Sequence, residues 1–88
     1  MVAFQLNDIT MIKDKVLDII SKTINVDKSL LTDDLSIGEI AEWDSVGNLA
    51  IIAAIEKELQ LEIPLEDLFE MTSIESIMTE VKKLTGAQ

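Results

Sequence analysis

The sequence lacks the side chains on which most enzymes depend for nucleophilic and acid–base chemistry. It contains no cysteine, no histidine and no tyrosine, and its seven basic residues are all lysines. Without cysteine, disulfides, thiolate catalysis and cysteine metal sites are excluded. Without histidine, the commonest general base and metal ligand is missing, and a Ser–His–Asp triad cannot be built. We therefore expect no catalytic site and no metal site, and a protein that is not an enzyme.

Positive charge is also scarce. Seventeen acidic residues against seven lysines give a net charge of −10 at pH 7. Such a surface argues against binding to nucleic acid or anionic membranes and favours basic patches on partner proteins. The longest uninterrupted apolar run, from Leu49 to Ile55, is too short to span a bilayer. The N-terminus lacks the pattern of a secretory signal peptide, so we expect a cytoplasmic protein.

The apolar content predicts one small helical domain. The chain has 88 residues, of which 48% are hydrophobic, enough for a single core spanning residues 1–88. Apolar residues recur at three- and four-residue spacing, and no alternating strand pattern of useful length is present. The prediction is an all-α fold: a small four-helix bundle with three longer helices, a short third helix and a long ordered loop between helices 1 and 2. We expect it to be a monomer.

The first predicted helix is amphipathic. It begins near Asn7 or Thr10, both suitable caps, and ends at Asn25, a residue suited to the left-handed conformation. The connection that follows, residues 26–43, holds many turn formers, but also apolar residues that need burial, so we expect it to be ordered and packed on the helices. Its acidic residues do not fit the spacing of an EF-hand calcium loop. The predicted buried stripe of the first helix comprises Ile12, Val16, Ile19, Ile20, Thr23 and Ile24.

The second predicted helix, from Ser45 to Gln60, is apolar on more than one face. One stripe contains Ile51 or Ile52 together with Ile55 and Leu59, and we assign it to the core. A second stripe consists of Val46, Leu49 and Ala53. In so small a domain this second stripe is either a partner interface or is covered by the connection 26–43.

Two further predicted helices, a short one and a longer one, complete the chain. Pro64 favours a new helix start, and residues 65–70 predict a short helix with Leu65, Leu68 and Phe69 facing inward. Thr72 and Glu75 have the spacing of a capping box for a last helix that ends near Gly86. The inward stripes of the three longer helices give the predicted core: Val16, Ile20, Ile51, Ile55, Leu59, Ile77 and Val81.

The pair Asp44-Ser45 opens the second helix and is the candidate functional site. Asp and Ser both start helices, because their side-chain oxygens accept hydrogen bonds from the first free backbone N–H groups. A phosphate esterified to Ser45 would be stabilised there by those N–H groups and by the helix dipole. The alternative is that both residues only cap the helix.

The arrangement of the whole chain, roughly from Ile9 to Leu84, resembles the acyl carrier protein family. Its centre is Asp44-Ser45-Val46, which is similar to the Asp-Ser-Leu attachment motif of the family, with Val in place of Leu. Downstream, the family spacing continues without a gap. The matching segments are Glu56-Lys57-Glu58-Leu59, Glu62-Ile63-Pro64 and Thr72-Ser73-Ile74-Glu75.

The resemblance implies a function as a carrier. In this family a phosphopantetheinyl transferase moves 4'-phosphopantetheine from coenzyme A to the serine matching Ser45, and the arm then holds an acyl group as a thioester. The expected role is therefore to carry acyl intermediates in fatty-acid or polyketide-type biosynthesis, with acyl- or aminoacyl-loading and processing enzymes as partners. Two alternatives remain: an aminoacyl or peptidyl carrier, and an unmodified helical interaction module.

The chain departs from the family pattern after the serine. Gly47 and Ala50 stand where many fatty-acid carriers have acidic residues, and Gly47 lowers the helix propensity of the first turn. Trp43 either packs in the protein, covers the connection or contacts the base of the cofactor. The predicted cofactor-binding residues are Ser45 and Asp44, and the predicted partner-binding residues are Val46, Leu49, Ala53 and Glu56.

Overall fold

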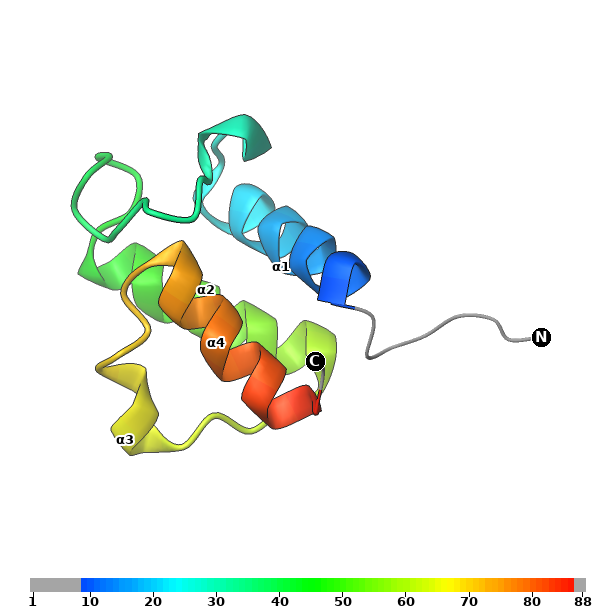
Figure 1. The fold of residues 1–88 in the computed structure, drawn as a ribbon. Helices are drawn as coiled ribbons and strands as arrows, with labels where there is room; N and C mark the ends of the chain where they lie inside the picture. The colour runs from blue at the N-terminus through cyan, green and yellow to red at the C-terminus, as the bar shows by residue number, and fades with distance from the viewer. Residues whose placement is uncertain (1–8, 87–88) are drawn as a thin grey trace.

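The computed structural model describes residues 9–86 and shows an all-α chain (Figure 1). This confirms the predicted fold class: three longer helices, a short third helix and a long connection between the first two. The elements are α1 (Ile9–Ile24), the 3-10 helix η1 (Lys28–Leu30), α2 (Ser45–Leu59), α3 (Leu65–Leu68) and α4 (Ile74–Thr85).

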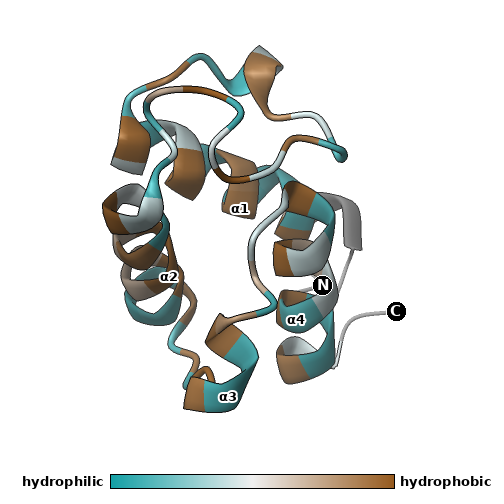
Figure 2. Cartoon of the chain, turned by 90° about the vertical axis from the view of Figure 1, so that its left-hand side faces the viewer, coloured by the Kyte–Doolittle hydropathy of each residue, from teal (hydrophilic) through white to brown (hydrophobic). Residues whose placement is uncertain are grey.

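The core lies between α1, α2 and α4. Figure 2 shows α2 and α4 on opposite sides, α1 behind them, and α3 closing the lower end. The helices meet through aliphatic side chains that alternate at helical spacing, so each helix buries one stripe. Six of the seven predicted core residues are fully buried, and Leu59 is only partly buried at the end of α2. The buried six are Val16, Ile20, Ile51, Ile55, Ile77 and Val81.

The ends of α1 and α2 are set by left-handed residues. Asn25 follows α1 with φ 60°, which confirms its predicted role. Gln60 follows α2 with φ 56°, so α2 ends one residue earlier than predicted. At the other end of α1, Thr10 lies within the helix, so the prediction of Thr10 as its cap was wrong. The alternative cap, Asn7, lies outside the described residues.

The connection between α1 and α2 is ordered and packed, as predicted. Leu31 and Trp43 are buried, while Leu30 is exposed at the end of η1. Backbone hydrogen bonds join the connection to the start of α4, including one from the Ile37 N–H to the Thr72 carbonyl at 2.8 Å. Because these bonds satisfy backbone groups that a coil would leave to water, the connection forms part of the fold.

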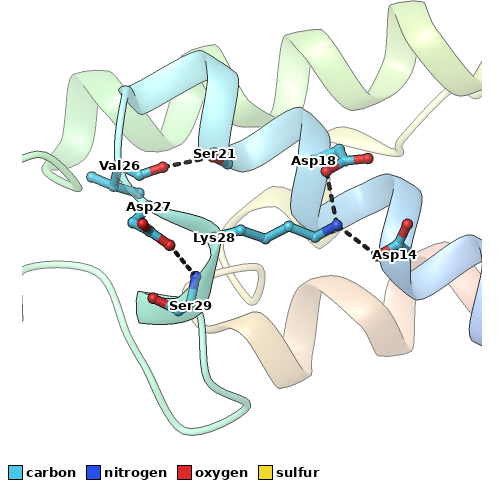
Figure 3. Close-up of polar contacts among 7 residues, drawn as sticks. All are labelled: Asp14, Asp18, Ser21, Val26, Asp27, Lys28 and Ser29. Atoms are coloured by element: carbon cyan, nitrogen blue, oxygen red, sulfur yellow. Dashed lines mark hydrogen bonds and ion pairs between the residues drawn. The ribbon is translucent and has the colours of Figure 1, made fainter.

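Polar side chains hold the start of this connection against α1 (Figure 3). The Nζ of Lys28 lies 2.6 Å from a carboxylate oxygen of Asp14 and 2.8 Å from one of Asp18. The Ser21 hydroxyl donates to the Val26 carbonyl at 2.6 Å. These contacts fix where the chain leaves α1.

The inward orientation predicted for residues 65–70 was wrong for Leu65 and Phe69, but Leu68 does pack against the core. Leu65 is 71% exposed and Phe69 is 80% exposed, while Leu68 is half-buried. The helix is shorter than predicted: α3 ends at Leu68, so Phe69 lies beyond it, and none of its four residues is fully buried.

The predicted cap of α4 was also wrong in its residues. Ser73 is the N-cap, and its hydroxyl accepts from the Ser76 N–H at 3.0 Å, while the Ser76 hydroxyl accepts from the Ser73 N–H at 2.9 Å. The box therefore lies one residue later than Thr72 and Glu75, because the helix itself begins at Ile74. Gly86, with φ 76°, ends α4 as predicted.

Candidate functional site

Ser45 is the first residue of α2, and its side chain is exposed. Asp44 is the N-cap in an extended conformation, and its Oδ1 accepts a hydrogen bond from the Gly47 N–H at 2.7 Å. The predicted start of the helix is confirmed. Asp44 therefore caps the helix, while the hydroxyl of Ser45 stands at the end where a helix favours negative charge.

Close packing explains why glycine stands at position 47, despite its low helix propensity. A Cβ atom at this position would lie 2.9 Å from the Glu42 carbonyl oxygen and 3.3 Å from the Asp44 Oδ1. Any larger side chain would push the first turn of α2 away from the segment that precedes Ser45. The acidic residue expected here from the family pattern therefore has no room in this chain.

Trp43 packs in the protein interior. It is fully buried, and its Nε1–H donates to the Asn48 Oδ1 at 2.9 Å. The Asn48 Nδ2 in turn donates to the Met71 carbonyl at 3.1 Å. This excludes contact of the indole with a cofactor base in this structure. Sequence analysis missed Asn48, although a lone amide in an apolar helix segment signals a buried hydrogen bond.

The second stripe of α2 is exposed. Val46 is 76% exposed, Leu49 is 60% exposed, and Ala53 is exposed as well. The connection between α1 and α2 therefore leaves this face open, and of the two alternatives only the open one agrees with the structure. Val46 and Leu49 lie one residue and four residues after Ser45, so an apolar strip begins beside the candidate attachment site.

Glu56 is engaged within the chain. Its Oε2 accepts from the Ile63 N–H at 2.9 Å, and the side chain is half-buried. This carboxylate thus holds the segment that follows α2. It lies well along the helix from Ser45, beyond the apolar strip formed by Val46, Leu49 and Ala53.

The geometry fits covalent attachment of a phosphate ester at Ser45. Ser45 is exposed, and it lies at the N-terminal end of a 15-residue helix. Within residues 9–86, no group of three or more acidic side chains is placed to hold a metal ion. In the same part of the chain, no helix is both long and apolar enough to cross a membrane.

Comparisons with known proteins match most of the chain to one family. A family model described as a phosphopantetheine attachment site matches residues 14–81. An acyl carrier protein of Syntrophobacter fumaroxidans is 26% identical over 80 residues, covering 91% of this chain and 99% of the relative. One from Rickettsia canadensis is 26% identical over 72 residues, covering 82% of this chain and 84% of the relative.

A solved structure shares the fold. The holo acyl carrier protein of Geobacter metallireducens superposes with a TM-score of 0.75 at 22% sequence identity. The similarity covers 84% of this chain and 85% of that protein. The arrangement of α1, α2, α3 and α4 is therefore an acyl-carrier-like fold.

Proposed function

Because the chain belongs to the phosphopantetheine attachment family, we propose that Ser45 is its attachment residue and that the protein carries acyl groups. The observation that supports this is the placement of Ser45: an exposed hydroxyl on the first residue of α2, directly after the Asp44 cap. Asp44 keeps the first turn wound, so the hydroxyl is presented to a phosphopantetheinyl transferase on an ordered element.

The chain's own contribution is to present, not to catalyse. When bound, the 4'-phosphopantetheine arm supplies the thiol that this cysteine-free chain lacks and holds the acyl group as a thioester. With no cysteine, histidine or arginine, the chain has no evident group to activate a nucleophile. Catalysis then belongs to the transferase and to the loading and processing enzymes that meet the carrier. We expect these encounters in the cytoplasm, with the carrier acting as a monomer of one domain.

The names of the relatives favour an acyl cargo over an aminoacyl or peptidyl one. The Syntrophobacter and Rickettsia relatives are both called acyl carrier proteins. Mass spectrometry of the arm on protein purified from its source would identify the cargo directly. An amino acid on the arm would show that the protein is an aminoacyl carrier and not an acyl carrier.

The attachment site is tested by intact mass. Wild-type protein treated with a broad-specificity transferase and coenzyme A should gain one phosphopantetheine, and Ser45→Ala should gain none. Since Asp44 supplies the cap, Ser45→Ala should change the free energy of unfolding by no more than about 1 kcal/mol. Ser29→Ala, on the exposed η1 helix, is the control and should be modified normally.

Two results would contradict this assignment. Modification of Ser45→Ala at another residue would show that the site was misplaced. Failure of the wild type under conditions that convert a known carrier would favour the unmodified interaction module instead.

The docking surface is tested with two variants of α2. A desolvated apolar centre contributes more affinity than rim charges, which mainly affect association rates. Leu49→Ser should therefore raise the KM of a partner enzyme for the carrier more than Glu56→Gln does at physiological salt. Because Leu49 is largely exposed, the Tm of Leu49→Ser should stay near that of the wild type. If Glu56→Gln has the larger effect on KM, partner recognition depends on charge.

A further inference from the structure

A buried polar residue lies one turn along α2 from Ser45. Asn48 follows Ser45 by three residues and is 7% exposed, whereas the next residue, Leu49, faces solvent. Burying an amide is costly unless its donor and acceptor are both bonded. Both halves of the Asn48 amide are bonded, its Oδ1 to Trp43 and its Nδ2 to Met71.

These bonds join three parts of the chain at one point. The Trp43 indole belongs to the segment that leads into Ser45, and the Met71 carbonyl belongs to the connection between α3 and α4. The Trp43 carbonyl is held as well, since it accepts from the Gly38 N–H at 2.7 Å. The residue two places before Ser45 is therefore fixed through both its side chain and its backbone.

Close packing at Gly47 also holds the backbone around Ser45 in place. The missing Cβ of Gly47 lets the Glu42 carbonyl lie against the first turn of α2. Within residues 42–48, Trp43 and Asn48 are buried, while Ser45 is exposed together with Glu42, Asp44 and Val46. The backbone position from which the Ser45 hydroxyl projects is therefore fixed.

We propose that Asn48 is a positioning residue for the Ser45 hydroxyl in phosphopantetheine transfer. This inference rests on the proposed function of Ser45. Transfer forms a bond from the Ser45 hydroxyl oxygen to a phosphorus of coenzyme A and breaks the pyrophosphate bond, so that the adenosine bisphosphate part leaves and the hydroxyl proton passes to a base of the transferase. The hydroxyl oxygen must lie opposite the leaving oxygen, and small displacements of a reacting group lower rates steeply. By tying Trp43 to Met71, Asn48 keeps the start of α2 in one place while a transferase acts on it.

The test is steady-state transfer by a broad-specificity transferase, with the unmodified carrier as the varied substrate. Asn48→Leu keeps the size of the side chain but removes both hydrogen bonds. At a temperature where circular dichroism shows every variant folded, its kcat should fall on the order of tenfold, with KM nearly unchanged. The apolar strip of α2 still docks, so the loss falls on the reaction and not on binding.

Three other variants separate positioning from stability and docking. Ile20→Val loosens the core from α1 and should transfer at the wild-type rate although it melts earlier. Leu49→Ser should raise KM with kcat near that of the wild type. Trp43→Phe removes only the bond from the indole to Asn48 and should lower kcat by a smaller factor than Asn48→Leu. It also serves in place of Asn48→Leu if that variant does not fold.

Several outcomes would overturn the inference. A folded Asn48→Leu, or failing that a folded Trp43→Phe, with the wild-type kcat would assign the network to stability alone. A raised KM with unchanged kcat would assign it to docking. A kcat loss of equal size in Ile20→Val would make the effect a general consequence of destabilisation. If the wild type itself is not modified, the proposed function fails, and the inference fails with it.

Discussion

The two connections that flank α2 are held to the bundle by different means. The first, residues 25–44, places Leu31 and the whole Trp43 side chain in the core. The second, residues 60–73, is buried at Ile63 and Met71, but α3 between them has no buried residue. The first connection, which leads into Ser45, is therefore fixed by packing. The middle of the second connection, α3, is instead held by contacts at the protein surface.

The surface attachment of α3 depends on titratable groups. The Nζ of Lys83 on α4 lies 3.2 Å from the Asp67 Oδ2 and 3.3 Å from the Glu80 Oε1. Burial, and then contact with Asp67, raise the pKa of Glu80 above its usual value. Hydrogen bonding to Glu80, and then to Lys83, lowers the pKa of Asp67. Of the two carboxyls, Glu80 is therefore the one that takes up a proton first as pH falls.

The largest expected effect comes from removing the aromatic anchor of the first connection. Trp43→Ala should lower the free energy of unfolding by about 3–5 kcal/mol, because it empties a fully buried site and leaves Asn48 without a partner. Phe69→Ala, in the exposed second connection, should change it by no more than about 0.5 kcal/mol. Urea unfolding followed by circular dichroism measures both.

Equal losses in these two variants would remove the distinction between the connections. Trp43→Phe is the intermediate case, since it keeps most of the buried area and loses the hydrogen bond. Its loss of unfolding free energy should lie between those of Trp43→Ala and Phe69→Ala.

The second prediction concerns pH and the attachment of α3. A carboxyl whose pKa is raised on folding stabilises the fold fully below its unfolded pKa, and this contribution is lost as pH rises through the folded value. For Glu80 the loss begins above the ordinary value of 4.5. Asp67 has the opposite sign: its contribution is present above 3.8 and is lost as pH falls through the lowered value. Charged Glu80 and Asp67 repel each other at higher pH, and Lys83, which pairs with both, offsets part of this repulsion.

Glu80→Gln should therefore stabilise the protein progressively as pH rises, because the Gln amide can donate to Asp67 at every pH. The Tm of the variant minus that of the wild type should increase from pH 5 to pH 8. Glu58→Gln removes the same charge from an exposed position on α2 and serves as the control. Two other acidic residues, Glu70 and Glu75, line a surface hollow together with Glu80. A difference that stays flat with pH would show that Glu80 is charged throughout.

The sequence predicted the longer helices well because their periodicity reflects burial directly. Apolar spacing located α1, α2 and α4, and cap residues located the Asp44 start and the Asn25 and Gly86 ends. The first connection was also predicted to be packed, since so many of its apolar residues needed burial. For the candidate site, Ser45 and its Asp44 cap could be placed from their position before an apolar run.

The remaining features depend on tertiary structure that local patterns do not encode. Leu65 and Phe69 look like core residues by type and spacing, yet both are exposed in the folded chain. The Thr72 and Glu75 spacing fits a capping box, but the tertiary bonds of the first connection shift the start of α4. Glu75, for example, gives its N–H to the Asp33 carbonyl. The partners of Asn48 lie in other segments, so no local pattern could reveal them.

The smallest expected effect comes from the ion pairs at the start of the first connection. With a net charge of −10, the protein repels itself, and added salt should raise its Tm. Lys28 opposes this repulsion locally through Asp14 and Asp18, and hydrogen bonding to Lys28 lowers the pKa of Asp18. Lys28→Met and Lys57→Met both change the net charge from −10 to −11, but the described residues show no ion pair for Lys57.

At low salt Lys28→Met should therefore melt below Lys57→Met, and the gap should close as salt rises. Screening lengths fall from about 30 Å at 0.01 M to about 3 Å at 1 M salt, so a surface pair loses most of its effect over that range. Exposed pairs contribute little, and the gap should be smaller than the difference between Trp43→Ala and Phe69→Ala. If the gap persists at high salt, Lys28 stabilises the connection through the packing of its methylene chain on α1. The first connection would then be held by packing alone, and ion pairs would contribute to stability at α3 in the second connection.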